Sequence, residues 1–317
     1  MKRIITVTPN PAMDLSYHVA GIRPGASHRV PAPLSRAGGK GLNVARVAHQ
    51  LGLPALALAP YGGSSGAEFA AELESSGVPH KLVPVAGPTR RSIALVDTVG
   101  GETSIFNEEG SPLSRGEWQA LAAVVVDALA VEGEGAPGVL AASGSLPPGA
   151  PADFYPALVR LAHDAGIPAI VDTSGSGILA AAEAGADLLK PNHHELEEAT
   201  GERDPVAAAW QLIGLGAKTV LVSAGADGML AFSHATPDGY WRARLPEALT
   251  GNPTGAGDAA VAAAATALAE GVTDTKEILR RATAWSAAAV LMPAAGEISP
   301  RHAELKEQLI ISWEDHQ

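Results

Sequence analysis

Helical and extended segments alternate regularly after residue 116, and this alternation constrains the fold more than any other feature of the sequence. Apolar residues at helical spacing predict helices over 116–131, 152–165, 177–184, 193–200 and 205–215. Short apolar runs predict strands over 138–142, 168–172, 187–189 and 218–223. Strands that alternate with helices form a parallel sheet that helices cover on both faces. We therefore expect an α/β protein with a mostly parallel central sheet.

The remaining segments extend this pattern at both ends of the chain. We predict strands over 3–8, 55–61 and 80–85, helices over 42–52 and 67–76, a hairpin of 229–233 with 240–244, and last helices over about 275–291 and 300–313. Two half-exposed extended regions, near 14–36 and 91–107, differ from the rest and predict a small β appendage on the α/β body. The second of them is predicted to fold as a hairpin around Val99-Gly100-Gly101. No linker or repeat divides the chain, so we expect a single domain over residues 1–317.

The composition excludes several classes of protein. The chain has 317 residues, no cysteine and a formal net charge of −12. A chain without cysteine has no disulfide, thiol nucleophile or cysteine-bound metal, which is typical of a cytoplasmic protein. No stretch approaches the roughly 18 apolar residues of a membrane span, and the start reaches Pro9 too soon for a signal peptide. The acidic charge, without a Lys/Arg cluster, argues against nucleic-acid binding but leaves room for anionic metabolites at local cations or amides.

Glycine-rich and polar loops are predicted at the ends of several strands. They cover residues 9–14, 143–149, 172–177, 190–195, 223–228 and 251–258. Ligands of parallel sheets bind beyond the carboxyl ends of the strands. These loops therefore predict a single active site.

Residues 251–260 are the strongest candidate for the chemistry. The run AAVAAAATALAE (259–270) has strong helix-forming composition, and Gly255 and Gly257 permit a turn before it. The unpaired N–H groups at such a helix start form an anion site. Asp258, at the mouth of this site, is either a helix N-cap or a general base for phosphoryl transfer. An aspartate at a helix N-terminus should have a low pKa and be a weak base at rest.

Residues 190–195 (KPNHHE) offer oxygen ligands for a metal. Asn192 and Glu195 are three apart and suit Mg²⁺ if a helix begins there; the alternative is a capping box between the same two residues. His193 and His194 are adjacent and do not share a helix face, so a joint metal site is not expected. Residues 223–228 (SAGADG) predict either a tight turn or a glycine backbone packed against nucleotide phosphates.

Two short motifs compete with this interpretation. Gly175-Ser176-Gly177-Ile178-Leu179-Ala180 matches a dinucleotide fingerprint, but short matches of this kind are common in Gly- and Ala-rich chains. Gly62-Gly63-Ser64-Ser65-Gly66 matches a hydrolase nucleophile elbow, for which His302 has no supporting motif. No Walker A sequence is present, so a P-loop NTPase is excluded.

Six motifs, taken in order and spacing, resemble the PfkB (ribokinase-like) carbohydrate kinase family. They are TVTPNPAMD (6–14), AGGKGLNVARV (37–47), SGSLPPG (143–149), KPNHHE (190–195), SAGADG (223–228) and NPTGAGDA (252–259). The resemblance implies a three-layer α/β/α fold with a small β-sheet lid from about 12–36 and 88–108, through which a homodimer would form. It also implies ATP, Mg²⁺ and a sugar acceptor. A non-catalytic sugar- or nucleotide-binding protein is the alternative from another class, but such a relative would lose Asp258 or the polar residues on the Mg²⁺ side.

The resemblance also implies roles for individual residues. Asp258 would accept the sugar hydroxyl proton, and the amides of Gly255, Ala256, Gly257 and Asp258 would hold the transferring phosphoryl group. The acceptor would contact Asp14, Gly38, Gly39, Lys40 and Asn43 through its sugar, and Arg90, Ser143 and Arg29 through its phosphate. ATP would contact Lys190, Asn192, Ser223, Gly225, Ala226, Gly228 and Gly257, with Mg²⁺ on Asn192 and Glu195, through water. A K⁺ site would lie at the backbone of 252–254.

The acceptor within the family stays open. TRRSIA (89–94), SGSLPPG and the NPAMD start favour the kinases related to 1-phosphofructokinase, tagatose-6-phosphate kinase and the minor 6-phosphofructokinase. FNEEG (106–110) resembles 1-phosphofructokinases, whereas NPTGAGDA resembles tagatose-6-phosphate kinases. His28, next to Arg29, stands where these kinases often have Asn or Lys. We expect fructose 1-phosphate as first choice, followed by tagatose 6-phosphate or fructose 6-phosphate.

Overall fold

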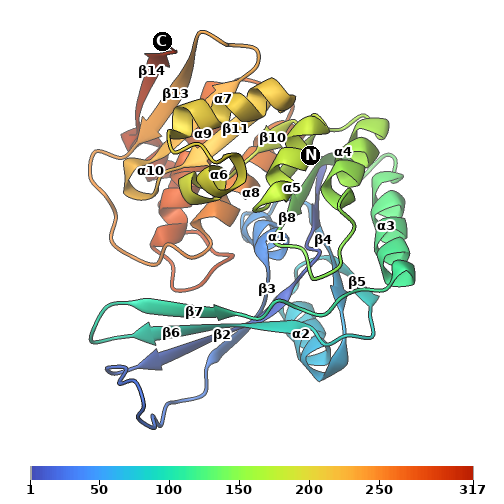
Figure 1. The fold of residues 1–317 in the computed structure, drawn as a ribbon, viewed down its shortest axis with the longest axis vertical. Helices are drawn as coiled ribbons and strands as arrows, with labels where there is room; N and C mark the ends of the chain where they lie inside the picture. Colours follow the sequence, from blue (N-terminus) through green and yellow to red (C-terminus); the bar gives the residue numbers. More distant parts are fainter. Residues whose placement is uncertain (1, 317) are drawn as a thin grey trace.

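The computed structural model describes residues 2–316 and divides their strands between two sheets (Figure 1). Seven neighbouring strands of the large sheet are parallel: β5 (His80–Pro84), β4 (Ala55–Tyr61), β1 (Arg3–Val7), β8 (Pro137–Ser143), β9 (Ala169–Asp172), β10 (Leu188–Leu189) and β11 (Thr219–Ser223). Three antiparallel strands continue the sheet: β12 (Met229–Ser233), β13 (Gly239–Arg244) and β14 (Ile310–Asp315). The predicted α/β class with a mostly parallel sheet is confirmed.

Helices cover both faces of the large sheet, as the alternation predicts. One face carries α1 (Lys40–Gln50), α2 (Gly63–Ser76), α8 (Ala256–Ala269), α9 (Thr275–Val290) and α10 (His302–Gln308). The other carries α3 (Arg115–Leu129), α4 (Phe154–Asp164), α5 (Ser176–Glu183), α6 (His193–Thr200) and α7 (Pro205–Leu215). Strand β1 shows why two cores result, because Ile4 and Ile5 alternate between them. In the part of the chain that is described, no helix is both long and apolar enough to cross a bilayer.

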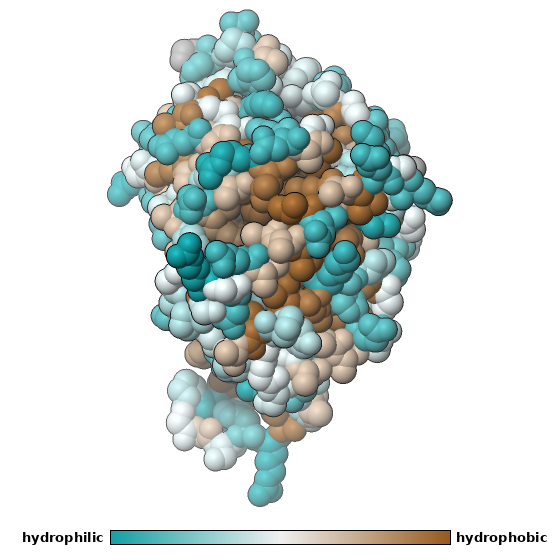
Figure 2. All heavy atoms as spheres, turned by 90° about the vertical axis from the view of Figure 1, so that its right-hand side faces the viewer, coloured by the Kyte–Doolittle hydropathy of each residue, from teal (hydrophilic) through white to brown (hydrophobic). Residues whose placement is uncertain are grey.

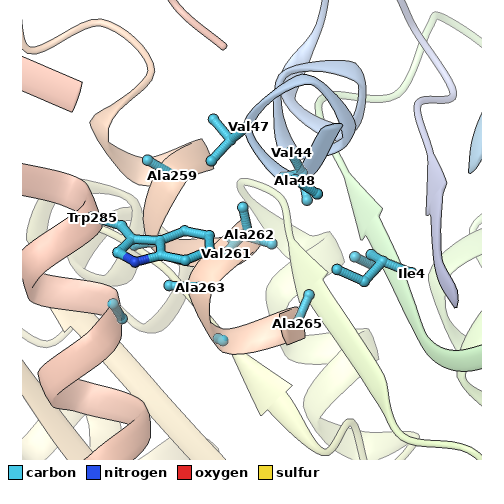
Figure 3. Packing of buried hydrophobic residues seen from close by; sticks show 14 of the residues in the cluster. Ile4, Val44, Val47, Ala48, Ala259, Val261, Ala262, Ala263, Ala265 and Trp285 are labelled. Atoms are coloured by element: carbon cyan, nitrogen blue, oxygen red, sulfur yellow. The ribbon is translucent and has the colours of Figure 1, made fainter. Parts of the chain in front are cut away.

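Helix α8 lies at the centre of the first core. Its residues from Asp258 to Ala267 are all buried, and most of them are alanines. Figure 3 shows Ala259 and Ala262 between Val47 of α1 and Trp285 of α9. Alanine side chains end at Cβ, so they allow the helix to approach its neighbours closely. The composition that predicts a helix here thus also allows its burial on all sides.

The small sheet is confirmed and consists of β3 (Leu34–Gly38), β2 (Ala12–Val19), β6 (Arg90–Asp97) and β7 (Thr103–Asn107), in this order. The predicted hairpin is the antiparallel pair β6–β7. Figure 1 shows this sheet extending away from the body, and in the side view of Figure 2 its end protrudes below the molecule. All side chains of β7 are exposed, including Phe106. The lid therefore leaves one of its strands largely open to solvent.

The prediction for the last helix is wrong at its C-terminal end. Helix α10 ends at Gln308, and residues 310–315 form β14 rather than helix to 313. Ile310 and Ile311 favour extended backbone because they are β-branched. Trp313 packs against Trp241 of β13 with ring centroids 5.1 Å apart. Pairing with the sheet edge, which local spacing does not reveal, decides the conformation.

We expect that Ala263→Leu destabilises the protein by about 1–3 kcal/mol, the usual cost of adding side-chain carbons to a packed core. Ala263 is fully buried in α8, so the added atoms must displace α9, α1 or the sheet. Urea unfolding measures the change. The matched control is Ala123→Leu on the exposed face of α3, which should change stability little; equal effects of the two variants would contradict the packing argument.

Candidate active site

A cavity of about 1200 Å³ lies at the carboxyl ends of the parallel strands. Residues from all of the predicted loops contribute to its wall: Asn10, Gly144, Asp172, Asn192, Ser223 and Gly255 are one example from each. Residues of the small sheet, including Asp14 and Arg90, contribute to the same wall. The loops that sequence analysis singled out therefore meet at one site.

Asp258 lies in the first turn of α8 and faces this cavity. The helix N-cap is Gly255, whose φ of +85° requires glycine, so the N-cap interpretation of Asp258 is wrong. The carboxylate is only 6% exposed. Its Oδ2 accepts a hydrogen bond of 2.8 Å from Asn43 Nδ2 of α1. Asn43 thus fixes the orientation of the carboxylate.

The pKa of Asp258 is raised, contrary to the expectation of a low value. Burial and the charge of Asp172 raise the pKa from 3.8 to about 6, although Lys40, Asn43 and Lys190 act in the opposite direction. The helix N-terminus acts only through partial charges, and full desolvation outweighs them here. A carboxylate with a pKa near 6 is a stronger base than a solvated aspartate, yet it is ionised at neutral pH.

The backbone at the start of α8 provides the predicted anion site in part. The Ala256 amide donates to Pro253 O at 3.1 Å and is used by the turn. Among the described residues, the amides of Gly257 and Asp258 have no such partner. A Cβ on Gly257 would lie 3.1 Å from Lys190 Nζ, so the ammonium group lies beside these amides. Two amides and one cation therefore favour a negative charge next to Asp258.

Asp172 is the main site residue that motif analysis missed. It ends β9 and is 1% exposed. Its Oδ1 lies 3.2 Å from Lys40 Nζ and 3.7 Å from Lys190 Nζ. The only signal in the sequence was its position at the start of the polar loop 172–177. Asn10, Ser145, Asn107, Glu108 and Ser286 also line the cavity and were missed.

Asn192 and Glu195 form the capping box that was one of the two interpretations. Asn192 Oδ1 accepts from Glu195 N at 2.8 Å, and Glu195 Oε2 accepts from Asn192 N at 2.9 Å. Both residues line the cavity as well. Within residues 2–316, no three His, Cys, Asp or Glu side chains form a group that could hold a metal. A metal here would need additional ligands from a nucleotide or water.

Most residues predicted to contact the acceptor lie in the small sheet or at the start of α1. Burial raises the pKa of Asp14 to about 7, against the effect of Arg90, and the charge of Asp258 adds to the rise. Arg90 donates from Nε to Asn10 O and from Nη1 to Glu108 O, both at 3.1 Å. A Cβ on Gly38 would lie 1.9 Å from Asp14 Oδ2, so only glycine fits beside this carboxyl group. Gly39, with a φ of +118°, Lys40 and Asn43 line the cavity next to it.

The nucleotide candidates follow β11. Ser223, Gly225, Ala226 and Gly228 all line the cavity, and Gly225–Asp227 form a short 3₁₀ helix. A Cβ on Gly228 would lie 2.1 Å from Ala243 O, so this glycine is required by close packing with β13. The tight turn, one of the two interpretations of 223–228, is therefore present, and it faces the cavity.

Three predicted residues do not line the cavity: Gly38, which packs against the Asp14 carboxyl group, Arg29 and Ser143. Arg29 is exposed in the loop between β2 and β3, where the neighbouring His28 accepts a hydrogen bond from Arg23 N. Ser143 is fully buried at the end of β8, and Ser145 lines the cavity instead. Sequence spacing placed Ser143 in the right loop but not on the right side of the strand end.

The loop 293–298 supports the start of α8 from behind. A Cβ on Gly255 would lie 2.8 Å from Ala295 Cα, so the two backbones are in close contact. Arg36 of β3 donates to Ala295 O at 2.9 Å and pairs with Glu297 at 2.5 Å. Gln50 of α1 exchanges two hydrogen bonds with the backbone of Ile298. Residues from the N-terminal part of the chain therefore hold the loop that supports the anion site.

A buried carboxylate beside two backbone amides and a lysine, at the carboxyl ends of a mostly parallel sheet, agrees with a kinase of ribokinase-like fold. The model of the pfkB family carbohydrate kinases matches residues 7–301, and the chain belongs to this family. The two competing motifs, at 62–66 and 175–180, contribute no residue to the cavity wall.

The names of similar proteins indicate the kind of kinase. The chain is 38% identical over 299 residues to the ATP-dependent 6-phosphofructokinase isozyme 2 of Mycobacterium tuberculosis, covering 92% of this chain and 85% of that protein. It is 36% identical over 305 residues to the 1-phosphofructokinase of Xanthomonas campestris, covering 93% of both. The structure of Escherichia coli phosphofructokinase-2 in complex with potassium matches with a TM-score of 0.86 at 32% identity, covering 97% of this chain and 98% of that one. The chain is accordingly an ATP-dependent sugar-phosphate kinase.

We expect that Asp258→Asn lowers kcat by about 10²–10⁴-fold, the usual effect of losing a general base, and that ATP binding is retained. Wild-type kcat/KM, which reports groups of the free enzyme, should fall as the pH drops through about 6, because Asp258 becomes protonated there and no longer accepts a proton. Steady-state rates between pH 5 and 8 measure this pH dependence, which the Asp258→Asn variant should lack. Turnover of the variant within about tenfold of wild type would show that another group is the base.

Proposed function

We propose that the chain transfers the γ-phosphoryl group of ATP to fructose 1-phosphate and forms fructose 1,6-bisphosphate. The observation that carries the proposal is the position of Arg90 and Asp14 in the same cavity as Asp258. A guanidinium group suits bidentate recognition of a phosphate. A carboxyl group such as that of Asp14 suits a sugar hydroxyl. An acceptor that already carries a phosphate would therefore find partners for both of its ends.

In the proposed reaction, Asp258 accepts the proton of the sugar hydroxyl. The hydroxyl oxygen forms a bond to the γ-phosphorus, the bond from this phosphorus to the bridging oxygen breaks, and ADP leaves. The Gly257 and Asp258 amides and Lys190 would stabilise the charge on the transferred group. Phosphoryl transfer depends mainly on positioning and charge stabilisation, which agrees with a base held by Asn43.

The nucleotide would lie along the other half of the cavity. It would contact Ser223, Gly225, Ala226 and Gly228. An apolar wall for its nucleobase is formed by Leu245, Leu249, Ala287 and Val290. The residues fit a divalent cation, because Asp172 Oδ2 is buried without a hydrogen-bond partner among the described residues, and a carboxylate oxygen is a ligand that Mg²⁺ prefers. Asn192 and Glu195 would hold Mg²⁺, through water, and the ion would neutralise phosphate charge when bound.

Two further acceptors have specific support. Fructose 6-phosphate is favoured by the name of the M. tuberculosis relative, and tagatose 6-phosphate by the motif at 252–259. Fructose 1-phosphate stays first, because the segment 106–110, which resembles 1-phosphofructokinases, contributes Asn107, Glu108 and Glu109 to the cavity wall. A coupled assay of ADP release on the three sugar phosphates and on free fructose decides among them. Equal activity on fructose and its phosphates would contradict the phosphate requirement.

A monovalent cation and a dimer are part of the same proposal. K⁺ would bind at the backbone of 252–254. That the similar E. coli phosphofructokinase-2 forms a complex with potassium supports a role for this ion. A homodimer would form through the small sheet, where Leu34, Ile105 and Phe106 are exposed. Exposed apolar groups gathered on one sheet are typical of an association surface.

We expect that Arg90→Ala lowers kcat/KM for the preferred sugar phosphate on the order of 30- to 1000-fold, since a charge-assisted contact is lost. Steady-state kinetics at saturating ATP measure the change. The control is turnover of free fructose, which has no phosphate to lose and should change little. An equal loss on both acceptors would show that Arg90 supports the fold of the lid rather than the phosphate.

A further inference from the structure

Lys40 occupies the space between the two carboxylates that face the proposed metal position. Its Nζ lies 3.2 Å from Asp172 Oδ1 and 3.1 Å from Glu195 Oε1. A lysine side chain is ordinarily an ammonium at neutral pH, and two carboxylates at ion-pair distance favour this charged form. The side chain is about one third exposed and reaches into the cavity. A flexible stem carries its charge, which can therefore move.

The oxygens proposed for the metal are already used in this state. Glu195 Oε2 and Asn192 Oδ1 are used by the capping box. Glu195 Oε1 accepts from Lys40. A cation at Glu195 Oε1 would therefore meet the positive charge of Lys40 unless this side chain moves away. Asp172 keeps one buried oxygen, Oδ2, without a partner among the described residues, so its carboxylate is not saturated.

We infer that Lys40 is a tethered cation that holds the divalent-cation position between Asp172 and Glu195 until a metal–nucleotide complex enters the cavity. The inference rests on the proposed metal role of Glu195 and extends it. Three carboxylates share this end of the cavity: Asp172, Glu195 and Asp258. Without a cation between them, Asp172 and Glu195 would repel each other. Lys40 supplies that cation from the chain itself. A free divalent ion must then compete with a covalently attached ammonium, which is always present at high local concentration.

This arrangement has a consequence for the order of binding. The free metal would bind poorly, because its approach meets the charge of Lys40. A metal that arrives on nucleotide phosphates brings negative charge with it, so Lys40 can leave the carboxylates for a phosphate oxygen. The ammonium then stays in the part of the cavity that holds Asp258. Lys40 is in this respect a positioning residue for the metal and a binding residue for the nucleotide.

Binding of Mn²⁺ to the nucleotide-free full-length protein tests the inference. Electron paramagnetic resonance measures the free ion directly and needs neither turnover nor an acceptor. We expect Lys40→Met to bind Mn²⁺ tighter than wild type on the order of tenfold or more, because a nearby like charge is removed. Lys40→Arg keeps the charge and should bind as weakly as wild type. The matched control is Lys218→Met, which removes a lysine paired with Asp187 at 2.6 Å, outside the cavity, and should change nothing.

The site of the ion is tested by double variants. In Lys40→Met/Glu195→Gln and Lys40→Met/Asp172→Asn, the added affinity should disappear. Circular dichroism and thermal melting establish whether each variant is folded. If Lys40→Met does not fold, Lys40→Gln replaces it as the neutral variant. The inference would be overturned if folded Lys40→Met bound Mn²⁺ with an affinity within about twofold of wild type. It would also be overturned if the gain in Mn²⁺ affinity persisted in both double variants. A wrong acceptor would appear only in the kinase assay, so failure of the proposed function is separable from failure of this inference.

Discussion

The burial of α8 is the constraint on which the active site depends. A helix that is enclosed by α1, α9 and the sheet must carry small side chains, and the run from Ala259 to Ala267 provides them. The same enclosure removes water from Asp258 at its first turn. Desolvation then raises the pKa of this carboxyl group to about 6. Close packing in the core and base strength at the site are therefore two results of one arrangement.

The charges around Asp258 show how the protein keeps a buried acidic site stable. Asp172 is 1% exposed and would be unfavourable alone, but Lys40 and Lys190 lie within 4 Å of its Oδ1. Lys40 is the first residue of α1, and Lys190 directly follows β10. Regular backbone therefore fixes where each side chain begins, while its long stem stays adjustable. A net charge of −12 for the chain therefore says little about the site, where cations and backbone amides set the local field.

Much of the fold could be predicted from the sequence, because its signals are local. Periodicity located the helices and strands of the large sheet, and the strand-end loops predicted where the cavity lies. The strand at 310–315 was missed because its pairing with β13, which is distant in sequence, decides its conformation. The raised pKa of Asp258 and the role of Asp172 were missed for a related reason. Both arise from residues that are distant in sequence and meet only in the folded protein.

The motifs also left the orientation of individual side chains undetermined. Ser143 and Ser145 belong to the same SGSLPPG segment, yet one is buried and the other lines the cavity. Arg29 lies in an exposed loop of the lid rather than at the cavity. A motif specifies which loop reaches a site, whereas the exact path of the backbone decides which of its side chains faces the ligand.

The contacts of Arg36 and Gln50 with the loop 293–298 have a consequence for how the protein folds. They join residues that are 259 and 248 positions apart in the chain. Closing such long loops costs conformational entropy, so these contacts are unfavourable early in folding, when few other contacts have formed. The segment that supports Gly255 can be held in place only after both ends of the chain have met. Secondary structure and much of the sheet can therefore form before the anion site does. The ability to catalyse therefore depends on contacts between the two ends of the chain.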